Sequence, residues 1–149
     1  MPRFNFKLTS LLKLRRNQRD VCQQRLTEGL ARDAELVAMR VAAEKDRSTQ
    51  LNEIRELSAA GDMNVDAASA RRYFATQLTG DVLNIEHHRR ELAKYIGQCR
   101  QALMKADQAV KALEKLEENQ RTEFNQEQER RAGRELEETW QARHHGEQH

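Results

Sequence analysis

The chain has 149 residues, of which 34% are charged and 5% are aromatic, and its mean hydropathy is −0.96. Too little of it is apolar to fill a compact globular interior, so the composition favours long helices with narrow apolar stripes. The net charge of +2 excludes a strong overall attraction to nucleic acid or to an anionic membrane.

The proline and cysteine content and the length of the apolar runs further limit the classes of protein that this sequence can encode. Pro2 is the single proline, so nothing beyond it breaks a helix by proline chemistry. Cys22 and Cys99 are isolated, without metal-ligand spacing, and we expect two free thiols in a reducing, cytoplasmic setting and no disulfide. The longest apolar runs, such as LVAM, fall far short of the roughly 20 residues that cross a bilayer. We therefore expect a soluble protein.

The opening MPRFNFKLTSLLKLRRNQRD is basic and amphipathic, with no acidic residue before Asp20. Taken alone, this pattern is also typical of a mitochondrial presequence or a membrane-surface helix. The apolar positions nevertheless continue in helical phase beyond it, without a cleavage-like site. We therefore predict a long helix over about residues 5–60. Its broad apolar face comprises Leu8, Leu11, Leu12, Cys22, Leu26, Leu30, Val37, Val41, Leu51, Ile54 and Leu57.

Two segments interrupt this face. Residues 42–50, AAEKDRSTQ, are polar, and we expect the helix to bend or fray there. The stretch SAAGDMNVDAAS that follows is the densest cluster of turn-forming residues, which predicts a connection over about residues 61–66. Gly61 suits the position after a helix end, and Asp66 is predicted to cap the next helix.

A second helix is predicted over about residues 67–143. Its apolar residues follow a heptad repeat typical of a coiled-coil seam: Leu78, Ile85, Leu92, Cys99, Ala106 and Leu113, interleaved with Val82, Ile96, Leu103, Val110 and Phe124. If the two helices fold back antiparallel, the numbers of facing residues sum to about 125.

The predicted fold is all-α, with two long helices in an antiparallel coiled-coil hairpin that forms a single domain over residues 1–149. The second helix is longer and is expected to project past the N-terminus by roughly 20 residues. Leu136 and Trp140 are the apolar anchors of that projection, and residues 144–149 form a polar tail.

Catalytic and metal-binding patterns are weak. Two long helices offer no concave, water-poor pocket, so we expect no enzyme activity and no cofactor. His87 and His88 are adjacent and lack the i, i+4 spacing that binds a metal from one helix face. The ending RHHGEQH could chelate a metal weakly or remain a polar end, and we expect no metal site there.

One spacing is typical of a DNA-binding basic region, but the leucines that should follow it are missing. Asn17 and Arg25 have seven residues between them, as in the basic region of leucine-zipper proteins. The positions that should then carry leucines hold Glu35, Ala42 and Thr49. We therefore expect no nucleic-acid partner.

The opening Phe4-Asn5-Phe6-Lys7-Leu8, followed by Leu11-Leu12-Lys13-Leu14-Arg15-Arg16, resembles the FxFxLxxLLxLR start of the FliJ family of flagellar type III export proteins. The segment KALEKLEENQRTEFNQEQERRAGRELEE, residues 111–138, is similar to the charged second helix of that family. The resemblance implies a non-enzymatic central stalk of the export ATPase, which contacts the ATPase hexamer, its regulator and the membrane export gate and handles export chaperones. It also implies a cytoplasmic location, peripheral at the inner face of the cell membrane.

The resemblance implies two contact sites. A stalk enters a ring by the end where its termini lie, and basic side chains there would complement acidic loops. The expected ATPase-ring contact comprises Phe4, Phe6, Lys7, Lys13, Arg15, Arg16 and Arg19. The expected export-gate contact, on the second helix after the turn, comprises Phe74, Leu78, Asp81 and Ile85.

The export-gate stripe has two interpretations. It faces the polar segment of the first helix, which would leave it under-buried and available to a partner. Alternatively, Phe74 and Leu78 close the coiled coil against Leu51 and Ile54. Two other functions also stay open for the whole chain, a helical scaffold or spacer of another machine and an export chaperone that binds substrate helices.

Overall fold

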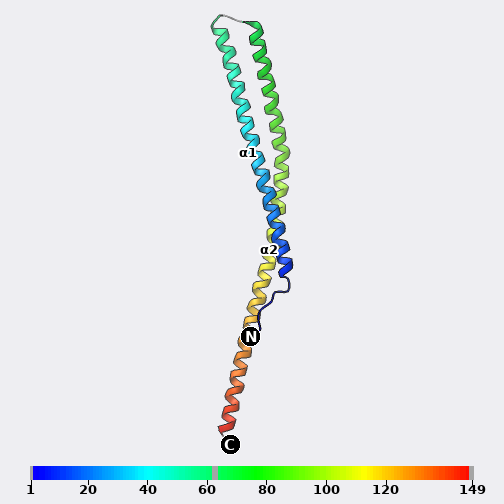
Figure 1. Cartoon of the computed structure of the whole chain (residues 1–149), viewed down its shortest axis with the longest axis vertical. Coiled ribbons are helices and arrows are strands. Elements are labelled where there is room, and N and C mark those ends of the chain that lie inside the picture. The colour runs from blue at the N-terminus through cyan, green and yellow to red at the C-terminus, as the bar shows by residue number, and fades with distance from the viewer. Residues whose placement is uncertain (1, 62–63, 148–149) are drawn as a thin grey trace. The chain divides into compact units, whose positions relative to one another are not determined.

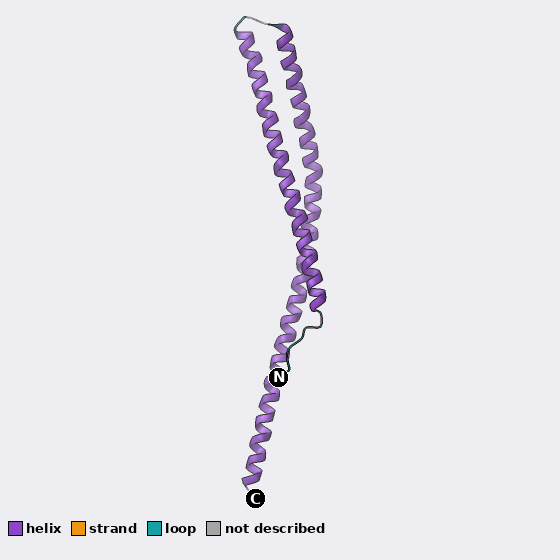
Figure 2. Cartoon of the chain, viewed as in Figure 1, coloured by secondary structure: helices purple, strands orange, loops and turns teal. Residues whose placement is uncertain are grey.

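The computed structural model describes residues 2–61 and 64–147. In these residues the fold is all-α, as predicted, and contains no strand (Figure 2). Helix α1 spans Thr9–Ala59 and helix α2 spans Val65–Glu147 (Figure 1). Close contacts divide the chain into two units: unit 1 comprises Met1–Asp20 with Met104–His149, and unit 2 comprises Val21–Leu103. The prediction of a single domain over 1–149 stays a prediction.

Helix α1 begins at Thr9, later than the predicted start at about residue 5. The Thr9 backbone N–H and side-chain hydroxyl both donate to the carbonyl oxygen of Phe6, at 3.3 and 2.7 Å. Residues two apart lie on the same side of an extended chain but on different sides of a helix. Phe4 and Phe6 are both withdrawn from solvent, so the non-helical start lets two aromatic rings pack at once.

The connection between the helices is capped on both sides. Gly61 has a φ of 71°, a left-handed conformation that glycine adopts without strain, as predicted for the end of α1. On the other side, Asn64 Oδ1 accepts from the N–H groups of Asp66 and Ala67 at 3.2 and 3.4 Å. The prediction of Asp66 as the N-cap is therefore wrong, because α2 begins at Val65 and Asp66 already lies in its first turn. Residues 62–63 of the predicted turn lie outside the described residues.

Helix α2 ends at Glu147, four residues beyond the predicted end. Residues 144–147 of the predicted polar tail are therefore helical, and residues 148–149 lie outside the described part of the chain. The Trp140 and His144 rings stack with centroids 4.2 Å apart, one helical turn from each other. This i, i+4 contact supports the last turns of the helix.

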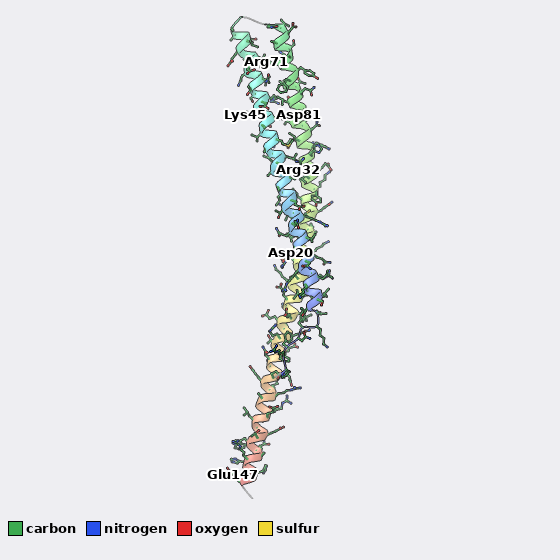
Figure 3. The ribbon with its side chains drawn as sticks, in the orientation of Figure 1. Asp20, Arg32, Lys45, Arg71, Asp81 and Glu147 are labelled. Atoms are coloured by element: carbon green, nitrogen blue, oxygen red, sulfur yellow. The ribbon has the colours of Figure 1, made fainter. Side chains whose placement is uncertain are left out.

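In unit 2, α1 residues 21–59 and α2 residues 65–103 run antiparallel side by side, and the turn joins them (Figure 1). Ion pairs link Arg40 to Glu86 at 2.7 Å and Arg89 to Asp33 at 3.0 Å. Nearer the turn, Arg71 is paired with Glu53 between the two helices (Figure 3). These pairs have residue numbers that sum to about 125, as the antiparallel prediction requires.

The face of α1 that meets α2 in unit 2 follows a regular heptad repeat, but four of its eleven residues are polar or charged. The heptad positions are Cys22, Leu26, Gly29, Asp33, Leu36, Arg40, Ala43, Arg47, Gln50, Ile54 and Leu57, and Val37 and Glu53 beside them are also partly buried. The predicted apolar face was wrong at Leu30, Val41 and Leu51, which are exposed. The helix also continues without a break through residues 42–50, where fraying was expected.

The core of unit 2 is built mainly from α2. Leu26 of α1 packs with Ile96 and Cys99, and Leu92 and Leu103 flank this cluster. The α2 side of the predicted heptad is confirmed at Leu78, Ile85, Ile96 and Cys99, which are all buried. Throughout the described residues, no helix is long and apolar enough to cross a membrane.

Candidate functional site

The N-terminal segment packs onto α2 within unit 1. Phe6 is 5% exposed and forms a cluster with Leu12 of α1 and Val110 of α2, the latter fully buried. Phe4 and Leu113 pack against the same cluster. Apolar burial of this kind is worth about 25 cal/mol per Å², so the segment is fixed to the helix although it lacks regular structure.

A second aromatic contact extends this attachment along α2. The rings of Phe4 and Phe124 are 5.7 Å apart and tilted by 53°. The guanidinium of Arg121 lies over the Phe4 ring, 4.9 Å from its centroid, which is the geometry of a cation–π interaction. We name residues 2–8 the N-terminal strap.

The predicted basic residues divide into two sets. Arg16 pairs with Glu114 at 3.4 Å and Arg19 pairs with Asp107 at 3.7 Å, so both connect α1 to α2 inside unit 1. Arg15 donates to Gln18 on its own helix at 3.0 Å. Lys7 and Lys13 are exposed. Within the described residues, neither lysine takes part in an ion pair, so they can meet a partner without breaking an internal contact.

The acidic side of these contacts is electrostatically stabilised. Lys111, hydrogen-bonded to Asp107 and helped by Arg19, holds the pKa of the Asp107 carboxyl below its usual range. Asp107 in turn raises the pKa of the Lys111 ammonium. The charge on Asp107 is therefore already compensated by Lys111 and Arg19.

The predicted ATPase-ring contact needs correction at Phe6. Because its side chain is buried against Leu12 and Val110, Phe6 contributes to internal packing and not to an open surface. A period-2 arrangement of Phe4 and Phe6 ahead of the first helical residue was visible in the sequence, but it was interpreted as helix. Of the predicted basic residues that form no ion pair within the described residues, Lys7 and Lys13 are exposed and Arg15 is half-buried.

The end of α2 contributes two residues that the predicted contact omitted. From residue 129 to residue 147 every side chain is exposed, including Leu136 at 72% and Trp140 at 61%. These two residues lie one turn apart, so they share a helix face. An isolated helical stretch gains little from propensity alone and is normally stabilised by packing of an apolar face. The sequence already identified both residues as anchors without a neighbour.

Of the four residues of the predicted export-gate contact, the structure buries two and exposes two. Leu78 and Ile85 are buried, so the expectation that they form an under-buried stripe is wrong. Phe74 and Asp81 are exposed. The reason for the burial is that the heptad of α1 continues through residues 36–47 and covers α2 there. The alternative interpretation, in which Phe74 and Leu78 close the helix pair against Leu51 and Ile54, agrees with the burial of Leu78 but is wrong for Phe74 and Leu51, which are exposed.

A groove nevertheless lies beside these residues. It has a volume of about 550 Å³ and its lining includes Leu78, Asp81 and Ile85 of α2 together with Ala42 and Ala43 of α1. Small side chains on α1 leave this space open. The predicted set therefore combines an exposed ring at Phe74 with a polar rim at Asp81 above two buried aliphatic residues.

A charged network occupies the middle of unit 2. Glu86 accepts from Arg40 and from Arg89, at 2.7 and 3.3 Å, and Arg89 also donates to Asp33. The hydrogen bond from Arg40, with that from Arg89, lowers the pKa of Glu86. Asp33 and Glu86 together raise the pKa of Arg89. All four groups are matched with opposite charges, which is typical of a structural network and not of acid–base catalysis.

Among the described residues, no group of three or more His, Cys, Asp or Glu side chains could hold a metal ion. The rings of His87 and His88 have centroids 6.1 Å apart. No family model matches the chain, and no curated protein or solved structure shows significant similarity to it.

Proposed function

We propose that the protein is a non-enzymatic component of the flagellar type III export apparatus and acts as the central stalk of the export ATPase ring. In this role it would link the ring to the membrane export gate and escort export chaperones. It would work on the cytoplasmic side, peripheral to the membrane through the apparatus.

The observation that carries the proposal lies in unit 1. An exposed helical stretch, residues 129–147, continues for about 35 Å beyond Phe124, where Phe4 of the strap contacts α2. A helix of this length without covering side chains is suited to insertion into a surrounding partner. The resemblance of the strap and of α1 to the opening of FliJ-family proteins identifies that partner as the ATPase ring.

The basic side chains of the N-terminal strap and of the first turns of α1 support a polar, reversible contact. Lys7, Lys13 and Arg15 are basic groups that no carboxylate of the described residues neutralises. Charged groups at the edge of an interface raise the association rate and make binding sensitive to salt. A stalk that turns or slides in a ring requires contacts of this kind and not a large apolar interface.

The test is binding of the full chain to a flagellar export ATPase hexamer, measured by surface plasmon resonance. Exchange of the two exposed lysines, in the variant K7E/K13E, should weaken binding by about an order of magnitude and reduce its salt dependence. Arg16 and Arg19 are left intact because reversing them would place like charges against Glu114 and Asp107 and disturb folding.

A matched control lies in unit 2. Lys45 and Arg72 are exposed, and the variant K45E/R72E changes the net charge by the same amount as K7E/K13E. It should bind the hexamer as the unmodified chain does. Equal losses in both variants would mean that bulk charge decides, and binding unchanged in the first variant would overturn the proposal. If the chain ignores the ATPase but captures isolated export-substrate helices, the chaperone function replaces it.

A further inference from the structure

Two cysteines of unit 2 line one cavity. Cys22 lies on α1 and Cys99 on α2, and both thiols are free. They border a cavity of about 380 Å³ together with Arg25, Tyr95, Gln98 and Ala102. Thiols that occur singly on a surface usually have no common environment, whereas these two come from different helices and share the same space.

The register of the helices places both cysteines at one level. Leu26 packs against Ile96 and Cys99 in the buried cluster of unit 2. Cys22 precedes Leu26 by about one turn on α1, and Cys99 follows Ile96 by about one turn on α2. Because the helices run antiparallel, these two steps lead in the same direction in space. Both residues also occupy heptad positions that face the other helix.

The two thiols differ in access. Cys99 is 7% exposed, and Cys22 is half-buried at the mouth of the same cavity. Tyr95 lines the same cavity, and its interaction with Cys99 raises the pKa of the Tyr95 hydroxyl. A reagent from solvent therefore meets Cys22 first, and Cys99 is positioned to react afterwards.

We propose that Cys22 and Cys99 are a reactive pair that a low-molecular-weight disulfide converts to one disulfide between α1 and α2. The Cys22 thiolate attacks a sulfur of the reagent, releases one of its two thiols and forms a mixed disulfide. The Cys99 thiolate then attacks the Cys22 sulfur and displaces the second thiol. The two cysteines lose two protons and two electrons, and the reagent is reduced to two thiols.

The cross-link closes a long loop of chain that includes the turn. It would hold the helices of unit 2 together against any partner that separates them, and reduction would release them. From the sequence we expected no disulfide, because the two cysteines are isolated in it. In the structure they line one cavity from different helices, and because a disulfide needs Cα atoms within about 7 Å, its formation would show that the helices approach each other that closely at this level.

The experiment treats the full chain with oxidised glutathione and digests it with trypsin under non-reducing conditions. Cleavage after the flanking basic residues places Cys22 in the peptide DVCQQR, residues 20–25, and Cys99 in YIGQCR, residues 95–100. We expect these two peptides to be found joined in the monomer fraction, at a yield independent of protein concentration. The unfolding temperature should rise by several degrees and return to its original value with dithiothreitol.

Two variants separate the roles of the two cysteines. Cys99→Ser should accumulate glutathione on Cys22, whereas Cys22→Ser should react slowly, because its remaining thiol is buried. Folding of each variant is checked by circular dichroism, and Cys22→Ser changes a half-buried position where the packing effect is small. Stable glutathione adducts in the unmodified chain, or joined peptides found in covalent dimers alone, would overturn the proposal.

Discussion

The two units hold their helices together by different chemistry. In unit 1, α2 is covered by an aromatic strap, and the central residues of the cluster are Phe6, Leu12 and Val110. In unit 2, charged residues occupy heptad positions between the helices, and Arg89 and Asp33 form an ion pair there. The first unit adds two ion pairs, Arg16–Glu114 and Arg19–Asp107, to an aromatic cluster, whereas the second combines a small aliphatic cluster with a network of four charged groups.

The two kinds of contact differ in how strictly they fix the position of one helix along the other. Apolar burial is non-directional and tolerates shifts of one helix along another. A charged residue at a seam position tolerates them poorly, because a shift leaves it without its partner in a partly dry environment. Unit 2 therefore has its register fixed by Asp33, Arg40, Glu86 and Arg89. Unit 1 fixes the position of the strap by the shape of its aromatic rings.

The largest expected effect comes from removing the central ring of unit 1. Phe6→Ala should destabilise this unit by about 3 kcal/mol, because the ring is buried and its loss leaves a cavity. Hydrogen exchange of the α2 amides around Val110, followed by mass spectrometry, measures the effect. Protection should fall there and stay unchanged around Ile85 in unit 2.

The control is the phenylalanine that sequence analysis assigned to the export-gate contact. Phe74 is 47% exposed, so Phe74→Ala should cost less than about 1 kcal/mol. Equal losses for the two substitutions would contradict the contrast between the strap and the exposed ring. A loss at Phe6 that spread through unit 2 would also contradict it, because the two units would then unfold together.

The second prediction tests the charged seam of unit 2. Asp33→Arg and Arg89→Asp should each lower the unfolding temperature, because each places like charges at a heptad position. The double variant should regain part of the loss, since the pair is reformed in the opposite sense. Recovery is incomplete because Glu86 then meets a carboxylate at position 89.

Thermal unfolding monitored by circular dichroism at low and high salt gives the measurement. Lys94→Glu is the control, since Lys94 pairs with Glu91 on the outer surface of the same helix, and its effect should be small. If the double variant were no more stable than either single variant, the pairing of Asp33 with Arg89 would not determine the register of the helices.

The pattern of α2 could be predicted from sequence, whereas that of α1 could not. The α2 heptad is filled by aliphatic residues such as Ile96 and Val110, and both are buried as predicted. On α1 the same repeat is interrupted by Asp33, Arg40 and Arg47, which appear solvated when read singly. Their role depends on partners on α2 that are distant in the sequence.

For the candidate site, the basic residues could be predicted from the sequence, whereas the burial of the apolar residues could not. Lys7, Lys13 and Arg15 were identified from charge alone and lie at or near the surface. The burial of Phe6 required the strap to leave the helix, which helical periodicity does not reveal. Leu78 and Ile85 were assigned to an open surface because the polar segment of α1 was expected to leave them uncovered.

The smallest expected effect separates two helical glycines of unit 2. A Cβ at Gly97 would have nothing within 4 Å, so Gly97→Ala should stabilise the chain by about 1 kcal/mol through helix propensity alone. A Cβ at Gly29 would lie 3.2 Å from Ile96 Cγ1, closer than normal packing, so α2 would have to move by a few tenths of an ångström. Gly29→Ala should therefore gain less than Gly97→Ala. Denaturation in guanidinium chloride compares the two midpoints, and equal gains would show that the side chains of Ile96 and Tyr95 do not pack closely against α1 at Gly29.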